Sequence, residues 1–241
     1  MQELLKPIRT ESLKDLFVKR FEELILSGTF AVGQKLPSER ELALQLGVSR
    51  PVVHEGLVDL AVKGLITLVP RVGTIVNDYR KEGSLSLLTS LVNYHQADLE
   101  PELFKSLLEM RLLFEVETAR LAALHRTQGQ LKAFRKLLQE EGAVNHQDTD
   151  GICALDFDFH HLVALASGNH IYPLLLNSFK NCYLNLACQF FCDAAVVPEV
   201  FAFHKAMVDA IDEQDEKTAA RIMKGLLAHG AEHLSGKAQR A

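Results

Sequence analysis

Three residues in the C-terminal part of the chain have the types and the spacing of metal ligands. Asp156 and His160 are four residues apart, which places both on one face of a helix. His204 opens a later helical segment. A carboxylate and two imidazoles that converge would suit a divalent ion such as zinc, nickel or manganese. The same spacing is common on solvated helix faces, so a purely structural role stays open as the alternative.

Arg111 is a candidate for binding an anionic ligand, because it lies among apolar residues of a helical segment. A guanidinium in such surroundings needs a planar anionic partner, either a carboxylate or a phosphate. The alternative is an internal ion pair with Glu115 or Asp156. The aromatic residues available to line a ligand cavity, or to form plain core, are Phe157, Phe159, Phe179, Phe190 and Phe203.

Near the N-terminus, a hydroxyl and a guanidinium stand at the start of a short helix. Ser38 and Glu41 have the spacing of a capping box, which predicts a first helix, and Gly47 is suited to end it. Ser49 then caps a second helix that opens with Arg50, the way a helix end is presented to DNA. The apolar residues expected to pack this pair of helices are Leu42, Leu44, Leu46, Val52, Val53, Leu57 and Leu60.

The elements around these two helices predict a winged helix. Upstream, apolar residues at helical spacing predict another helix behind Ser12 as its cap. Downstream, Gly64 ends the second helix. Residues 65–69 and 74–76 have the β-branched character of two short strands, joined by a turn at 70–73.

This ordered set of residues resembles the GntR family of bacterial transcription regulators over roughly residues 10–77. The resemblance implies a homodimer that binds a palindromic operator in double-stranded DNA, with recognition helices in successive major grooves and the wing tip at the minor groove. The segments that carry it are Leu36-Pro-Ser-Glu-Arg-Glu-Leu-Ala43, Leu46-Gly-Val-Ser-Arg50, Leu65-Ile66 and Gly73-Thr-Ile-Val76.

The resemblance also implies which residues contact DNA. The residues that match the contacting positions of the family are Arg40, Ser49 and Arg50 in the helices and Arg71 and Gly73 at the wing tip. His54 departs from the pattern, because the family usually has arginine there. We therefore expect a weaker or pH-dependent contact at His54 and a changed base preference.

Charge does not add a bulk attraction to DNA. The formal net charge is −5, and residues 1–78 contain ten basic and ten acidic side chains. DNA binding must therefore depend on the placement of Arg40, Arg50 and Arg71, and phosphate contacts would make it salt-dependent.

Composition predicts one or two domains with ample cores, because 48% of the 241 residues are hydrophobic. No run of about 18 apolar residues predicts a membrane span, and the first residues do not resemble a signal peptide. We therefore expect a cytoplasmic protein with no membrane partner. The cysteines are expected to be reduced and to pack as small apolar side chains: Cys153, Cys182, Cys188 and Cys192.

The predicted organisation is mainly α: a winged helix-turn-helix domain with a β-hairpin wing at 1–76, a polar linker at 77–84, and an all-helical effector-binding and dimerisation domain at 85–241. Bundles of antiparallel helices hold ligand sites in their interiors. The predicted helices of this six- to seven-helix bundle are 85–95, 100–125, 128–142, 152–167, 171–191, 197–213 and 215–233.

Residues 85–234 resemble the helical effector domain of the FadR subfamily of GntR regulators. In its metal-binding members the ligands are an Asp and a His four residues apart, a His that opens the penultimate helix, and a His in the final helix. Asp156, His160 and His204 match the first three. Leu226 stands at the fourth position, and His229 could replace it only if the helix end shifted. The resemblance therefore implies at most a three-ligand site completed by water.

Other stretches resemble the members of this subfamily that respond to long-chain acyl-CoA, above all Ala166–Tyr183. Arg111 and Tyr183 fall on retained pocket positions, whereas Phe190 and Phe203 replace tyrosines. Two effector classes stay open. One is fatty acyl-CoA, or another metabolite with a carboxylate or phosphate, in a regulator of fatty acid metabolism. The other is a small organic acid bound with a divalent metal.

A metal-dependent hydrolase is the rival class of protein, since Asp156, His160 and His204 could hold a metal with an open position for water. The chain contains no His-Glu-x-x-His, no Gly-x-Ser-x-Gly and no glycine loop that would cradle a phosphate. We therefore expect a regulator and not an enzyme.

Overall fold

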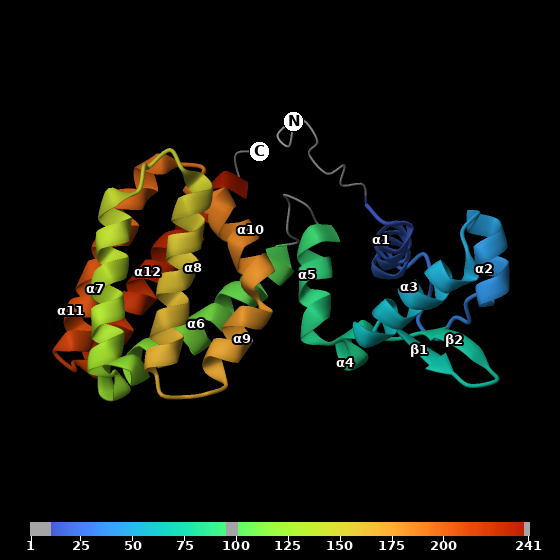
Figure 1. Ribbon diagram of the computed structural model, residues 1–241, viewed down its shortest axis with the longest axis horizontal. Coiled ribbons are helices and arrows are strands. Elements are labelled where there is room, and N and C mark those ends of the chain that lie inside the picture. The colour runs from blue at the N-terminus through green and yellow to red at the C-terminus, as the bar shows by residue number, and fades with distance from the viewer. Residues whose placement is uncertain (1–10, 95–100, 239–241) are drawn as a thin grey trace, which may run out of the picture. The chain divides into compact units, whose positions relative to one another are not determined.

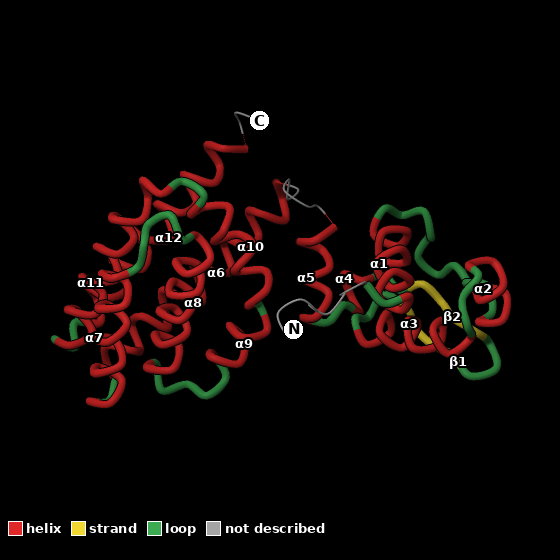
Figure 2. Tube along the Cα trace, turned by 45° about the horizontal axis from the view of Figure 1, so that its top comes forward, coloured by secondary structure: helices red, strands yellow, loops and turns green. Residues whose placement is uncertain are grey.

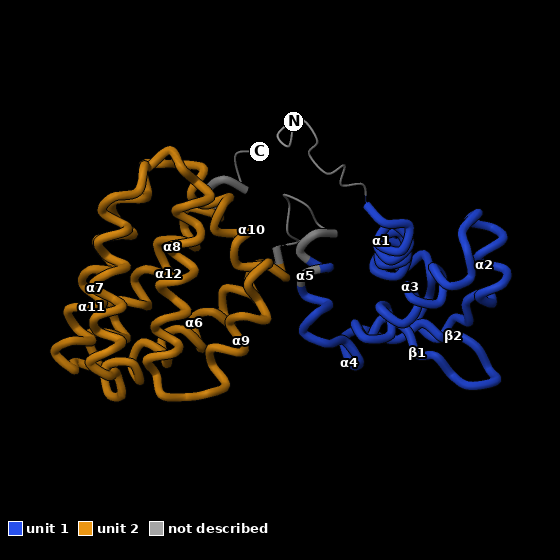
Figure 3. The backbone as a smooth tube through the Cα atoms, viewed as in Figure 1, with its two compact units in different colours: residues 1–94 blue, residues 95–241 orange. Residues whose placement is uncertain are grey.

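The computed structural model describes residues 11–94 and 101–238, which fall in two compact units, residues 1–94 and 95–241 (Figure 3). Helices dominate both units, and the described strands form one two-stranded antiparallel sheet in the first (Figure 2). The prediction of a mainly α chain with an N-terminal winged helix-turn-helix and a C-terminal helical bundle is confirmed.

Unit 1 contains the predicted helices and hairpin (Figure 1). Its elements are α1 (Leu13–Leu26), α2 (Glu39–Leu46), α3 (Arg50–Val62), β1 (Ile66–Val69), β2 (Gly73–Val76), α4 (Tyr79–Glu82) and α5 (Leu85–Tyr94).

The helix ends of unit 1 follow the capping residues. The Ser12 hydroxyl accepts a hydrogen bond from the amide of Asp15, and Ser38 and Glu41 form both hydrogen bonds of a capping box. Gly47 ends α2 in the left-handed region, with φ of 65°. Ser49 occupies the N-cap position of α3, but its side chain makes no capping hydrogen bond. The structure thus corrects the prediction that the Ser49 hydroxyl caps α3.

The core of unit 1 lies between α1, α3 and the hairpin, where Val53, Leu57 and Leu60 are fully buried. The prediction was wrong for Leu44, which is 85% exposed, while Leu42 is buried. The two residues are two positions apart, about 200° around the helix, so they cannot both face the core. Leu46, at the last position of α2, is also exposed.

Residues 77–84, predicted to be a polar linker, are hydrogen-bonded to unit 1. Asp78 caps the short helix α4, and the amide and hydroxyl of Ser84 donate to the carbonyls of Lys63 and Val62 at 3.1 and 3.0 Å. Gly64, with φ of +80°, passes so close that a Cβ atom there would overlap the carbonyl oxygen of Glu82. Residues 77–84 therefore belong to the folded body of unit 1.

Helix α5 also packs on unit 1, which corrects the predicted boundary before residue 85. Leu87 is buried in the core of this unit. The Ser90 hydroxyl donates to Glu22 Oε1 at 2.9 Å and accepts from Lys63 Nζ at 2.9 Å. The division between the units consequently follows Tyr94.

Unit 2 is a bundle of the α-helices α6 (Pro101–His125), α7 (Gln128–Ala143), α8 (Thr149–Ala166), α9 (Tyr172–Ser178), α10 (Lys180–Phe191), α11 (Val197–Asp212) and α12 (Glu216–Ala238). Helix α8 packs against α6, α7, α9 and α10, and α12 packs against α6 and α11. The prediction of one helix at 171–191 was wrong, because α9 ends and α10 begins at Phe179, whose ψ is 0°.

No single helix within residues 11–94 and 101–238 is both long and apolar enough to cross a membrane. By length and composition alone, α10 and residues 194–212 reach that threshold as a pair bent by 95°.

Candidate functional site

The three predicted metal ligands meet inside unit 2. Asp156 and His160 lie one turn apart on α8, and His204 comes from α11; all three are buried. Each offers an atom within 4.8 Å of the other two. The Nε2 atoms of His204 and His160 lie 3.6 and 4.0 Å from Asp156 Oδ1. Two nitrogens and one oxygen therefore converge on one point of the interior.

Two buried glutamates orient the two imidazoles. Glu141 Oε1 on α7 lies 2.7 Å from Nδ1 of His204, and Glu115 Oε2 on α6 contacts Nδ1 of His160. An ionised carboxylate can only accept, so Nδ1 of His204 carries the proton in its hydrogen bond to Glu141, and Nε2 of that ring, when neutral, presents its lone pair. Metal-binding histidines in proteins are held by carboxylates in this way.

The donor set fits a divalent metal. Nε2 of His204 is buried and has no hydrogen-bond partner among the described residues. A buried polar atom without a partner costs free energy, which a bound cation would recover. Asp156 adds the negative charge, while its other oxygen accepts a hydrogen bond of 2.5 Å from the Tyr183 hydroxyl. Burial and the neighbouring Asp156 raise the pKa of Tyr183 well above its ordinary value, so it stays a donor.

Arg111 is committed in part to an internal ion pair. Its Nε lies 2.5 Å from Glu115 Oε1, and its guanidinium stacks over the Tyr183 ring at 4.7 Å. Burial alone would raise the pKa of Glu115, but the charge of Arg111 and the contact with His160 outweigh it and lower this pKa to about 2. Glu115 is therefore ionised and links the guanidinium to the metal-type cluster.

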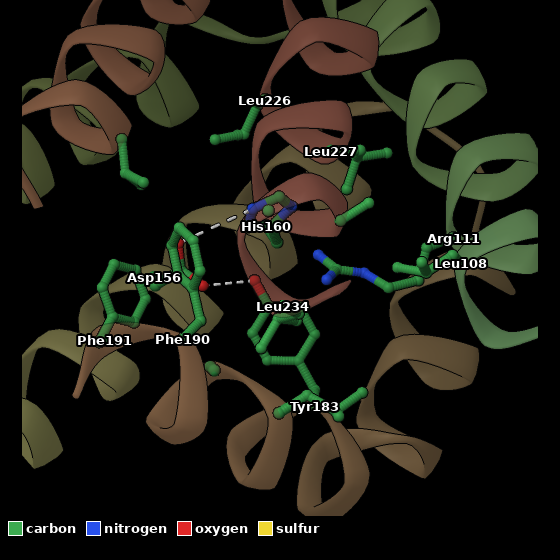
Figure 4. A pocket seen from close by; sticks show the side chains of 15 residues that line it. Leu108, Arg111, Asp156, His160, Tyr183, Phe190, Phe191, Leu226, Leu227 and Leu234 are labelled. Carbon is green, nitrogen blue, oxygen red and sulfur yellow. Dashed lines mark hydrogen bonds and ion pairs between the residues drawn. The ribbon is translucent and has the colours of Figure 1, made fainter. Parts of the chain in front are cut away.

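A cavity of about 50 Å³ lies beside this cluster (Figure 4). Arg111, His160 and Asp156 point into it, and Tyr183 closes one side. A cavity needs a volume of roughly 10–15 Å³ to hold one water molecule, so this cavity is large enough for a small molecule. Its apolar lining comes from α6, α10, α11 and α12 and includes Leu108, Leu186, Phe190, Phe191, Val200, Leu226, Leu227 and Leu234.

Two residues named from the sequence lie elsewhere. Phe203 does not line this cavity; its ring lies 6.2 Å from that of His229, measured between centroids. His229 is not part of the three-residue ligand group, and its Nδ1 lies 3.6 Å from Glu199 Oε1. Leu226 does line the cavity, so the fourth ligand position presents a methyl surface.

Sequence reasoning missed Glu141 altogether and named Glu115 only as a partner of Arg111. Glu141 stands in the run Gln-Glu-Glu-Gly, whose character is that of a solvated helix end. Only the position of Leu131 and Phe134, about three and two turns earlier on the same buried side of α7, signals that Glu141 faces inward.

The six predicted DNA-contacting residues are all exposed on unit 1. Arg40 and Arg50 border a hollow between α2 and α3 that also includes Leu44 and Val48. The wing tip is strained at Arg71, whose φ is +64°. The exposed residues of this set are Arg40, Ser49, Arg50, His54, Arg71 and Gly73.

A winged helix-turn-helix joined to a helical unit, whose mainly apolar cavity lies beside a buried polar cluster, is the architecture of a transcription regulator with an effector domain. Residues 17–76 match the gntR family of bacterial regulatory proteins, and residues 106–229 match the FCD domain. The chain belongs to the GntR family and is a DNA-binding regulator of the FadR type, not an enzyme.

Its relatives agree with this class. The chain is 30% identical over 227 residues to the HTH-type transcriptional regulator Mce2R of Mycobacterium tuberculosis, covering 92% of each chain. It is 28% identical over 193 residues to the fatty acid metabolism regulator protein of Proteus mirabilis, covering 80% of this chain and 78% of that one. The solved structure of Lar from Listeria monocytogenes shares the fold, with a TM-score of 0.65 at 15% identity, covering 95% of this chain and 99% of that one.

Proposed function

We propose that this regulator is controlled by a small carboxylic acid that binds in unit 2 beside a divalent metal held by Asp156, His160 and His204. The observation that carries the proposal is the buried Nε2 of His204, which faces Asp156 and has no hydrogen-bond partner in the described part of the chain, while Glu141 holds the opposite side of the ring. Zinc, nickel and manganese all accept this donor set.

The bound metal would supply positive charge for the carboxylate of the effector. Arg111 would supply the second anchor, because Glu115 occupies its Nε and leaves the outer nitrogens of the guanidinium for an anion. The leucine and phenylalanine lining would contact the remainder of the ligand. With Leu226 at the fourth position, a water or the effector itself must complete the coordination.

Elemental analysis of protein purified without chelator or affinity tag tests the metal. We expect about one equivalent per chain in the wild type and its loss in His204→Ala, with Phe203→Ala as a neighbouring control that retains the metal. A metal-free wild type that cannot be loaded with zinc, nickel or manganese would refute the proposal.

Fatty acyl-CoA is the second candidate effector. Relatives of this chain are named fatty acid metabolism regulators. The residues at the positions matched to an acyl-CoA pocket, Arg111, Tyr183 and Phe190, all line the cavity. Pockets for drug-sized ligands measure roughly 300–1,000 Å³, so an acyl chain would need the lining helices to move apart. Native mass spectrometry of freshly purified protein, with and without a chelator, distinguishes the two candidate effectors. A chelator should abolish binding of a small acid that depends on the metal and should leave acyl-CoA bound.

At the DNA, we propose that a homodimer in the cytoplasm places two α3 helices in successive major grooves of a palindromic operator. Arg40, Ser49, Arg50 and His54 would contact bases and phosphates, and Arg71 and Gly73 would reach the minor groove. The support is the common exposure of these residues on unit 1.

Arg50→Ala is expected to reduce operator affinity at least tenfold without changing the oligomeric state. The guanidinium opens α3, where a good bidentate base contact is worth about 1–3 kcal/mol. Fluorescence anisotropy measures the affinity and analytical ultracentrifugation the mass. Dissociation into monomers, or unchanged affinity, would contradict the assignment.

A further inference from the structure

His54 is held by a carboxylate from the neighbouring helix. Nδ1 of His54 on α3 lies 2.8 Å from Oε1 of Glu39, the first residue of α2. His54 is four residues after Arg50, so both project from the same face of α3. The His54 side chain is 60% exposed and that of Glu39 is 32% exposed. The pair therefore stands on the surface that also carries Arg50.

The partner decides which nitrogen of His54 carries the proton. An ionised carboxylate has no hydrogen to donate, so Nδ1 of His54 must be the donor in this hydrogen bond. In the neutral ring Nε2 is then a hydrogen-bond acceptor. An arginine at the same place would offer only donors.

This difference matters in the major groove, where bases are distinguished by donors and acceptors. Guanine presents the acceptors N7 and O6, which suit arginine, whereas adenine and cytosine present amino groups that donate. An accepting Nε2 matches an amino group and finds no hydrogen at the guanine edge. Resting on the placement of α3 in the major groove proposed above, we propose that Glu39 and His54 form one base-reading unit, in which Glu39 is a positioning residue and Nε2 of His54 accepts from the amino group of adenine or cytosine.

Selection from a pool of randomised DNA duplexes locates the base. The full-length protein is used at pH 8. Wild type, His54→Ala and His54→Arg are compared. The wild type should show a base preference at two symmetric positions of the selected operator that is lost in His54→Ala. At these positions we expect adenine or cytosine on the strand that His54 contacts. His54→Arg should prefer guanine at the same positions. No change in His54→Ala would overturn the proposal.

An atomic substitution in the DNA then identifies the contacted group. The adenine or cytosine is replaced by its analogue lacking the exocyclic amino group. We expect wild-type affinity to fall about fivefold per half-site, the usual worth of one neutral hydrogen bond. His54→Ala should be indifferent to this replacement. Equal loss in wild type and His54→Ala would show that another residue reads the amino group, and would refute the assignment.

A matched control separates the effect of Glu39 on the orientation of His54 from the effect of its negative charge on DNA binding. Glu39→Ala and Glu55→Ala each remove one carboxylate near α3, and Glu55 is an exposed neighbour of His54 on the same helix. Both should strengthen binding to all duplexes slightly, through reduced repulsion of phosphates. Only Glu39→Ala should reduce the ratio of affinities for the amino-bearing base and for guanine, to about twofold. Without the hydrogen bond to Glu39, the ring of His54 can adopt either tautomer. An unchanged preference in Glu39→Ala would remove Glu39 from the unit.

Discussion

At the scale of single residues, the interior of unit 2 is organised by glutamates that point inward. Glu115 contacts both Arg111 and His160, and Glu141 fixes His204. Glu115 is paired with the charge of Arg111, and one oxygen of Glu141 accepts a hydrogen bond from His204. The histidines are thereby set in one orientation before any ligand arrives, which lowers the entropy that binding would cost.

Glu115 should make the stability of unit 2 depend on pH at the acid end. Its pKa is lowered to about 2 in the folded chain, against 4.5 as the ordinary value. Its contribution is therefore complete above pH 4.5 and lost as the pH falls toward 2. A shift of this size corresponds to about 3 kcal/mol.

Urea denaturation of metal-free protein, repeated at several pH values below 5, measures this dependence. Glu115→Gln should show a shallower fall of the free energy of unfolding with decreasing pH, even though the variant is less stable throughout. Parallel curves for the two proteins would contradict the role assigned to Glu115.

Glu141→Gln should weaken metal binding about 10- to 100-fold, the usual effect of altering a carboxylate that orients a histidine ligand. Glu140→Gln is the matched control, since Glu140 is exposed and pairs with Lys136 on the surface at 3.2 Å. Zinc titration by calorimetry gives both affinities. Equal affinities in the two variants would remove Glu141 from the site.

That Asp156 and His160 share one face could be predicted, because a spacing of four residues fixes one helix face; His204 was named through the resemblance to the subfamily and not through spacing. Tertiary partners could not: nothing in a run of polar residues distinguishes the buried Glu141 from the exposed Glu140. The same limit applied to Leu44, whose apolar type predicted burial although its helix turns it outward.

At the scale of elements, Gly64 joins α3 to the hairpin and lets residues 79–83 pass closely. Gly64→Ala should lower the free energy of unfolding by more than about 2 kcal/mol, because it adds both left-handed strain and an overlap with Glu82. Gly28 is a matched control: its φ is +75°, but no atom lies within 4 Å of a Cβ placed there. Gly28→Ala should cost only about 1 kcal/mol. Equal losses in denaturant unfolding would contradict the close approach.

Elements with strong local signals were predictable, and those decided by packing were not. The capping box of Ser38 and Glu41 defined the start of α2 from the sequence. Helix α5 was assigned to the wrong unit, because periodicity shows that a helix has an apolar face and not which core receives it. Residues 77–84 looked like a linker for a similar reason, since their hydrogen bonds to Lys63 and Val62 leave no pattern in the chain.

At the scale of the whole molecule, the effector and the operator should affect each other's binding by the same factor. This follows from thermodynamic linkage if the ligand of unit 2 controls unit 1. Typical coupling is about 5- to 150-fold. Operator affinity measured with and without saturating ligand, and ligand affinity with and without operator, give the two ratios. Unequal ratios would indicate a competing equilibrium, and ratios of one would refute control by this site.

The attachment of α5 to unit 1 has a practical consequence for building hybrid regulators. A DNA-reading module cut at the end of the wing would lose Leu87 from its core and leave Glu22 and Lys63 without Ser90. Fusions that exchange sensing modules between relatives should therefore be joined after Tyr94. Such a junction transfers the complete hydrophobic core of the DNA-reading module and leaves the sensing module to begin with its own long helix, α6.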